Sequence, residues 1–127
     1  MSEVFQKRPY DQDPYLIIPK RPYQINVGYQ NPSLKCFVYG KGELFGDPMP
    51  FELAGLWIYF RLFNSQNVLV AAGEAYVIDM CSSEIEYQWN LLDVKDPGTY
   101  YGQFIFKDID GSKFVLPNKE KLLIVAS

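Results

Sequence analysis

Residues 85–126, IEYQWNLLDVKDPGTYYGQFIFKDIDGSKFVLPNKEKLLIVA, decide the fold, because they follow the pattern of consecutive antiparallel strands with turn signals between them. Ile85, Tyr87 and Trp89 alternate with polar residues, which is typical of a strand with one buried face. A turn-forming stretch covers 93–98, a second alternating strand covers 99–107, and Asp110-Gly111 is a hairpin signal. We therefore predict an antiparallel β-sandwich.

The chain upstream of this stretch extends the same pattern. Alternating strands are expected over 23–30, 34–39 and 73–80, separated by short polar turns. The most hydrophobic run, 56–63, is expected to be a central strand covered on both faces, with Trp57 and Tyr59 in the core. Counting along the chain gives about seven to nine strands, which is the spacing of an immunoglobulin-like sandwich.

Composition limits the possible roles. A chain of 127 residues with 17% aromatic residues buries enough surface for one stable domain without a disulfide or metal. The net charge of -3 gives no basic field for a phosphate backbone, so nucleic-acid binding is not expected. No apolar run reaches membrane-spanning length, and charges interrupt residues 1–20 where a signal peptide needs an apolar stretch. We expect synthesis and assembly in a cytoplasm, with no membrane partner.

The residue types argue against catalysis. Histidine is absent, which removes the commonest general base and metal ligand. Cys36 and Cys81 are expected to be free and mostly buried thiols, and neither has metal-ligand spacing. Acidic pairs such as Glu84 with Glu86 are expected to be solvated surface groups. We predict a protein that is not an enzyme and has no cofactor and no metal.

The first 22 residues differ from the rest, since they hold four of the nine prolines and repeat the tetrapeptide Lys-Arg-Pro-Tyr at 7–10 and 20–23. Proline favours extended backbone, so residues 1–22 are expected to be an extended Pro-rich N-terminal arm and residues 23–127 the sandwich. The arm either contacts a partner or packs along its own domain. A ligand for aromatic-groove domains is a further alternative. The long loop over 40–55 is a second candidate contact surface. The predicted contact residues are Arg8, Pro9, Tyr10, Tyr15, Ile17, Arg21, Pro22, Phe45 and Phe51.

A structural corner is predicted at Asp96-Pro-Gly-Thr-Tyr100, where Asp96, Gly98 and Tyr100 have the form of the tyrosine corner of immunoglobulin-like folds. Antibody domains carry a cysteine two residues after that tyrosine, but this chain has Gly102. Cys36 occupies the place of the other cysteine, and Trp57 that of the core tryptophan. No inter-sheet disulfide is therefore expected.

Residues 56–126 resemble a family of immunoglobulin-like domains in bacteriophage virions, similar to the N-terminal domain of baseplate upper proteins. The resemblance is carried by the following segments: 86–90, Asp93, 97–104, Asp110-Gly111, Pro117 and 122–125. It implies a non-enzymatic virion structural protein, either a head-associated auxiliary (capsid decoration) subunit or a fibre-anchoring subunit. Such a protein docks on capsid, fibre or baseplate subunits through its arm and loops, and is oligomeric in the assembled particle.

The sequence leaves two other roles open. One is a baseplate or tail structural module. The other is a carbohydrate-binding host-adhesion module, which would expose aromatic side chains in a row on one sheet face. The structural roles instead place exposed apolar surface on the arm and the 40–55 loop.

Overall fold

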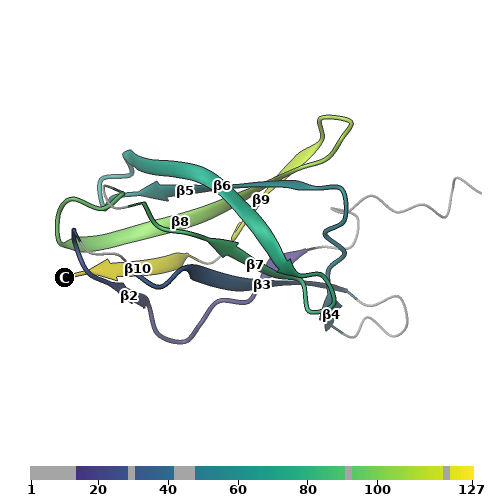
Figure 1. Ribbon diagram of the computed structural model, residues 1–127, viewed down its shortest axis with the longest axis horizontal. Helices are drawn as coiled ribbons and strands as arrows, with labels where there is room; N and C mark the ends of the chain where they lie inside the picture. Colours follow the sequence, from purple (N-terminus) through teal and green to yellow (C-terminus); the bar gives the residue numbers. More distant parts are fainter. Residues whose placement is uncertain (1–13, 29–30, 42–47, 91–92, 119–120) are drawn as a thin grey trace, which may run out of the picture.

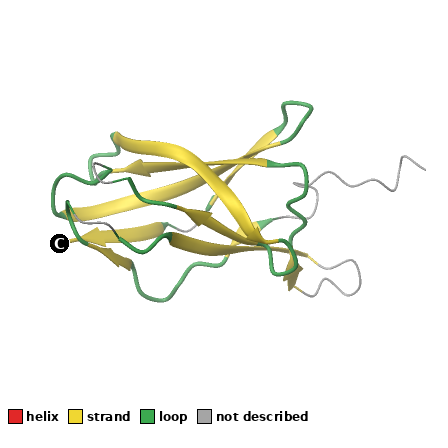
Figure 2. Cartoon of the chain, viewed as in Figure 1, coloured by secondary structure: helices red, strands yellow, loops and turns green. Residues whose placement is uncertain are grey.

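The computed structural model describes residues 14–28, 31–41, 48–90, 93–118 and 121–127. These residues form ten β-strands and no helix (Figure 2), which confirms the all-β prediction. The described part of the chain contains no helix long and apolar enough to cross a membrane. The strands are β1 (Tyr15–Leu16), β2 (Tyr23–Ile25), β3 (Leu34–Lys41), β4 (Pro48–Pro50), β5 (Trp57–Phe63), β6 (Leu69–Asp79), β7 (Glu84–Tyr87), β8 (Gly98–Lys107), β9 (Lys113–Leu116) and β10 (Leu122–Ala126).

The strands form one curled sheet that folds into the two layers of a β-sandwich (Figure 1). The strand order is β1-β3-β7-β6-β5-β8-β10-β2, with β4 paired to β3 and β9 paired to β8. All pairs are antiparallel except β10 with β2, which is parallel. The sheet is therefore mixed, and the prediction of a purely antiparallel sandwich is wrong at this one edge.

The long strand β6 joins the two layers. Ala75 in its first part pairs with Ile58 of β5, whereas Tyr76 in its second part pairs with Glu86 of β7. The register shifts between Val77 and Asp79. A bulge bends a strand and increases its twist, so β6 can leave one layer and enter the other.

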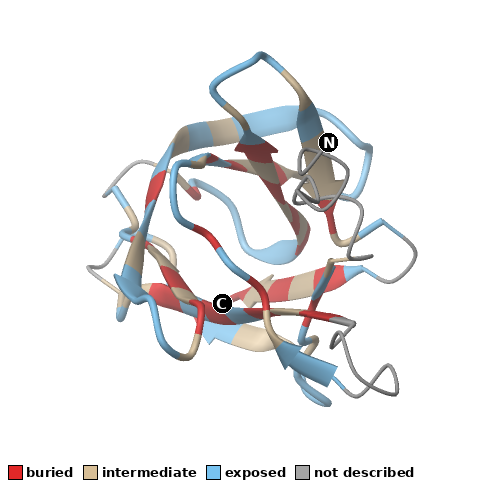
Figure 3. Cartoon of the chain, turned by 90° about the vertical axis from the view of Figure 1, so that its right-hand side faces the viewer, coloured by how far each residue is buried: buried red, intermediate tan, exposed pale blue. Residues whose placement is uncertain are grey.

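The core lies between the layers, where the inward residues of each strand meet (Figure 3). Its centre is a group of aromatic rings around Phe60, whose ring centroid lies 4.4 Å from that of Tyr87 and 5.0 Å from that of Phe104. The half-buried Trp89 packs edge-on against Phe60 at 5.8 Å. Burial of large rings supplies most of the hydrophobic stabilisation of a small domain.

The prediction that strand 56–63 is covered on both faces is wrong. In β5 the residues alternate, with Ile58 and Phe60 buried at 4% and 0% exposure, whereas Trp57 and Tyr59 are 53% and 38% exposed. The outer face of β5 carries aromatic residues instead of the usual polar ones. The alternation of buried and exposed residues is therefore not visible as an alternation of apolar and polar residues in the sequence. Trp57 is therefore not the core tryptophan of an immunoglobulin domain.

The described part of the predicted N-terminal arm contacts its own domain. Tyr15 and Leu16 pair with β3, and Leu16 is buried at 5% exposure. Residues 14–22 then cross to the other layer, where β2 pairs with β10. This matches the alternative in which the arm packs along its own domain; residues 1–13 lie outside the described part.

The predicted 40–55 loop contains a short hairpin. Met49 in β4 pairs with Gly40 of β3, and Phe51 then donates its backbone N–H to the carbonyl of Val38 at 2.9 Å. Residues 42–47 lie outside the described part. The hairpin explains how an apolar segment with several glycines and prolines is held on the sandwich edge.

Candidate functional site

Tyr100, which was predicted to form a structural corner, lies near the start of β8. The hydroxyl of Tyr100 donates a hydrogen bond of 2.6 Å to the backbone carbonyl of Asp96, and its side chain is buried at 6% exposure. Burial, followed by the charge of Asp96, raises the pKa of Tyr100 above its ordinary value. Gly98 has a φ of 149°, which glycine accepts more readily than other residues. The corner fixes the entry of the chain into β8 and is structural.

The residues predicted to contact a partner do not form one surface among the described residues. Tyr15 and Ile17 are 38% and 40% exposed on the β1 edge, Arg21 is exposed, and Pro22 is half-buried. The same prediction was made for four residues that lie outside the described part: Arg8, Pro9, Tyr10 and Phe45.

Phe51 was predicted to contact a partner, and the structure places it in the core instead. Its side chain is 1% exposed and packs edge-on against Phe114, with ring centroids 5.9 Å apart. The buried hydroxyl of Ser83 donates to its carbonyl oxygen. Phe51 therefore closes one end of the sandwich and presents no ring to a partner.

Both cysteines are free, but only Cys36 is buried; Cys81 is exposed, contrary to prediction. Burial raises the pKa of Cys36 to about 12, and its Sγ atom lies 3.7 Å from the hydroxyl of Tyr23. Within the described ranges, no group of three or more histidine, cysteine, aspartate or glutamate side chains lies together as metal ligands would.

Three of the exposed aromatic residues lie together on the outer face of β5 and β6. Tyr59 pairs with Glu74 and Ile58 with Ala75, so the next outward position of β5, Trp57, lies beside Tyr76. Trp57, Tyr59 and Tyr76 are 53%, 38% and 56% exposed. Side chains on one face of neighbouring strands are within reach of one another, so these residues form one surface feature.

A shallow hollow of about 160 Å³ lies among these side chains. The hydroxyl of Tyr76 donates a 3.0 Å hydrogen bond to Glu74 Oε2, and this bond, with the negative charge of Glu74, raises the pKa of Tyr76. We call this feature the aromatic hollow; it is lined by Leu56, Trp57, Ile58, Tyr59, Glu74, Ala75, Tyr76 and Val77.

Aliphatic side chains extend this exposed surface along β6 and the residues next to it. The exposed aliphatic residues are Val68, Leu69, Val70, Ile78 and Met80, each at least 40% exposed. Val68, Leu69 and Val70 lie at one end of β6, and Ile78 and Met80 lie at the other. Exposed apolar side chains at both ends of one strand favour a site of interaction. The surface lies on the sandwich itself and not only on the arm and the 40–55 loop, where the sequence placed it.

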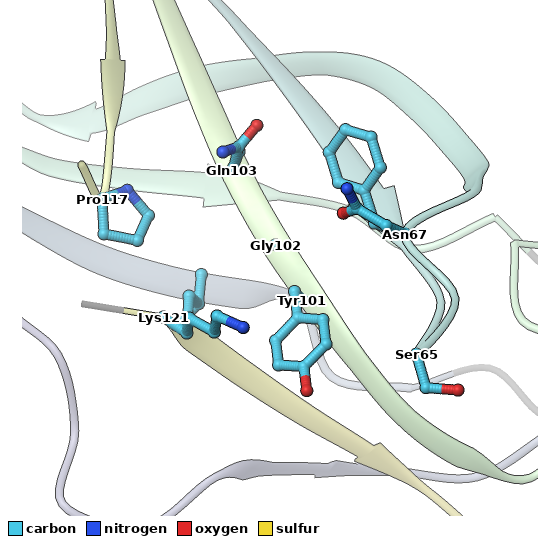
Figure 4. A pocket seen from close by; sticks show the side chains of 9 residues that line it. Ser65, Asn67, Tyr101, Gly102, Gln103, Pro117 and Lys121 are labelled. Atoms are coloured by element: carbon cyan, nitrogen blue, oxygen red, sulfur yellow. The ribbon is translucent and has the colours of Figure 1, made fainter. Parts of the chain in front are cut away.

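A second, larger hollow of about 470 Å³ lies at the other end of the same outer face (Figure 4). It lies between the described ends of β9 and β10: Leu116 of β9 pairs with Phe104, and Leu122 of β10 pairs with Gly102, on either side of Gln103. We call it the polar cleft; it is lined by Phe63, Ser65, Asn67, Tyr101, Gly102, Gln103, Pro117, Lys121 and Leu122.

Two cationic side chains act at the polar cleft. The Nζ atom of Lys121 lies 4.5 Å from the centroid of the Tyr101 ring, within the range of a cation–π contact. The guanidinium of Arg61 lies 5.6 Å from the Phe63 ring centroid, and its Nη2 atom donates to Gln103 Oε1 at 3.5 Å. The Nε atom of Arg61 is buried without a hydrogen-bond partner.

Sequence reasoning missed both hollows because it assigned the aromatic residues of 56–63 to the core. One signal was present: Glu74 is a charged residue in the strand 73–80, and Tyr76 shares its face by the period of two. No local sequence pattern indicated the polar cleft, because its lining residues come from three separate segments of the chain.

Comparison with known proteins does not assign a family to this chain. No family model matches the chain, and no curated protein matches it. Among solved structures, the chain matches the crystal structure of CopC from Methylosinus trichosporium OB3b at 13% sequence identity and a TM-score of 0.47, covering 90% of this chain and 93% of that chain. At this distance the match carries no ligand or role to this chain.

The predicted resemblance to phage virion domains is wrong. The solved structure that the chain matches is CopC, not a baseplate upper protein, and no family model matches residues 56–126. Strands, Asp-Gly turns and a tyrosine corner recur in unrelated β-sandwiches, so their order was not specific enough to identify a family. The capsid decoration, fibre-anchoring and baseplate roles depended on that resemblance and fall with it. The host-adhesion alternative presupposed a virion and falls too.

Proposed function

We propose that this chain is a non-catalytic binding domain with an immunoglobulin-like sandwich. The strand order supports the fold: β1-β3-β7-β6 has the order of strands A-B-E-D, and β5-β8-β10 has the order C-F-G. Tyr100 near the start of β8 supports it as well, since the tyrosine corner belongs to strand F. The absence of histidine from the sequence supports a role without acid-base catalysis.

The aromatic hollow carries the functional proposal. Three exposed rings around a carboxylate attract a cation, because the ring faces and Glu74 are both negative and a cation within about 6 Å of a ring centroid is stabilised. Exposed aliphatic residues lie before and after this point along β6, which suits a protein better than a free ion. The partner is therefore a protein surface on which a lysine or arginine projects from apolar neighbours.

Lys107 marks one limit of the site. It pairs with Trp57 on the β8 side of β5, opposite to the side on which Tyr76 lies. A partner cation is therefore expected to enter between β5 and β6, and not over β8.

A bead-bound random peptide library, probed with the full chain, tests this function. Enriched peptides should contain lysine or arginine next to apolar residues. The enrichment should disappear with Trp57→Ala and Glu74→Gln but persist with Glu52→Gln, an exposed glutamate outside the hollow. Enrichment of peptides without a cation, or equal enrichment on Glu74→Gln, would refute the proposal.

A titration with small compounds tests whether the positive charge of the partner is what the aromatic hollow recognises. The indole N–H signal of Trp57 in the full chain should shift with N-acetyl-arginine amide and N-acetyl-lysine amide, and much less with the uncharged N-acetyl-norleucine amide. Equal shifts with all three compounds would mean that apolar contact alone is recognised, and the assignment to a cation would be wrong.

A further inference from the structure

The polar cleft is independent of the aromatic hollow and has the opposite electrostatic character. Its described lining contains one charged side chain, Lys121, and no carboxylate. Arg61 adds a second positive charge just outside the lining, through its contact with Gln103. In a chain with a net charge of -3, a cleft with only positive charge on its described walls favours an anion.

The neutral polar groups of the cleft can act as donors. Arg61 donates to the amide oxygen of Gln103, so the amide N–H₂ of Gln103 is left for another acceptor. Figure 4 shows this nitrogen on the side that faces Pro117. Ser65 and Asn67 add a hydroxyl and a second amide on the opposite wall. A ligand that offers several acceptor oxygens would satisfy these donors together.

The remaining walls are apolar. The lining also includes the side chains of Phe63, Pro117 and Leu122 and the ring of Tyr101. The volume of about 470 Å³ lies within the usual range of small-molecule sites, roughly 300–1,000 Å³. A bare inorganic ion would leave most of this space and the apolar walls without contact, whereas an organic body would fill them.

We infer that the polar cleft binds a small organic acid. The carboxylate contacts the Lys121 ammonium and the amide groups of Gln103 and Asn67, and the hydrocarbon or ring body packs between Phe63 and Pro117. Arg61 is a positioning residue, because it acts through Gln103. No bond is made or broken, so the site is one of binding only.

The test is a titration of the full isotope-labelled chain, followed by NMR, with benzoate as the probe. Saturable shifts are expected at the Gln103 and Asn67 side-chain amides. Benzyl alcohol, which has the same ring without the charge, should bind at least tenfold more weakly. Equal affinity for the two compounds, or shifts confined to residues outside the cleft, would overturn the inference.

Substitutions and a second anion complete the design. Lys121→Met should weaken benzoate binding tenfold or more, whereas Lys107→Met, an exposed lysine on the same sheet face outside the cleft, should leave it unchanged. Unchanged Tyr100 signals in each variant confirm that the fold is intact. Inorganic phosphate should bind at least tenfold more weakly than benzoate; equal or tighter binding of phosphate would show a simple anion site and refute the organic acid. The outcome is separate from that at the aromatic hollow, because Trp57 should not respond to benzoate.

Discussion

The ring of Phe60 occupies the space that Gly102 leaves on the neighbouring strand. A Cβ atom at position 102 would lie 2.8 Å from Cε1 of Phe60 and 3.2 Å from a methyl carbon of Leu122. Gly73 on the other side of β5 makes similar room for Tyr87, at 3.0 Å. Antibody domains place a disulfide cysteine at the position of Gly102; here an aromatic ring fills the same volume between the layers.

Gly102→Ala should destabilise the domain by about 1–3 kcal/mol, because the added methyl group overpacks a core with no free volume at this point. Urea unfolding followed by tryptophan fluorescence measures the change. The exposed neighbour substitution Ala72→Ser should change the free energy of unfolding by less than about 0.5 kcal/mol. Equal stability of Gly102→Ala and the parent chain would show that Phe60 moves aside freely.

Much of this sandwich could be predicted from the sequence where the strands have one wet face. The alternation over 85–89 placed Ile85 and Tyr87 in the core, and both are buried at 0% and 1% exposure. The hairpin at Asp108 to Ser112 formed as the Asp-Gly pair indicated, with Asp108 donating its N–H to the carbonyl of Ser112 at 2.7 Å. These predictions were correct because the alternation of buried residues and the choice of turn residues depend on neighbours in the sequence.

The sequence failed where non-local contacts decide. Nothing local shows that β2 would pair in parallel with β10, or that Leu16 would be buried against β3. The outer aromatic face was missed because Trp57 and Tyr59 are large aromatic residues, which are often buried, and they lie in one run with the inward Ile58 and Phe60. Only the neighbouring strand, with Glu74 opposite Tyr59, reveals which face is outside.

Tyr100→Phe should lower the free energy of unfolding by about 0.5–1.5 kcal/mol, since it removes a single hydrogen bond, that of 2.6 Å to the Asp96 carbonyl. The measurement is again urea unfolding. Tyr59→Phe, which removes a hydroxyl from a side chain on the outer sheet face, is the matched control and should be nearly neutral. If the two variants unfold at the same urea concentration, the corner bond contributes nothing to stability.

The two faces of β5 should respond very differently to truncation. Phe60→Ala removes a fully buried ring and should cost about 3–5 kcal/mol. Trp57→Ala removes a larger side chain that is 53% exposed, and should cost well under half as much. Thermal unfolding of both variants checks this. Comparable losses would mean that the outer face of β5 is covered in solution.

Stability should fall as the pH rises above about 9. Burial raises the pKa of Cys36 from 9.0 to about 12, and burial also raises the pKa of Tyr23 and Tyr87 above their ordinary value. Below pH 9 these groups are protonated in both the folded and the unfolded chain. Above it the unfolded chain loses protons that the folded chain keeps, so the free energy of unfolding decreases with pH.

The Cys36 contribution can be separated from that of the tyrosines. A Cys36→Ala variant should have a shallower decrease from about pH 9 up to about pH 12, because over that range the thiol is ionised in the unfolded chain and protonated in the folded one. Urea unfolding at half-unit pH steps provides the measurement, and Cys81→Ala is the control, because that cysteine is exposed. An identical pH dependence for Cys36→Ala and the parent chain would show that the buried thiol ionises in the folded state as readily as in the unfolded one.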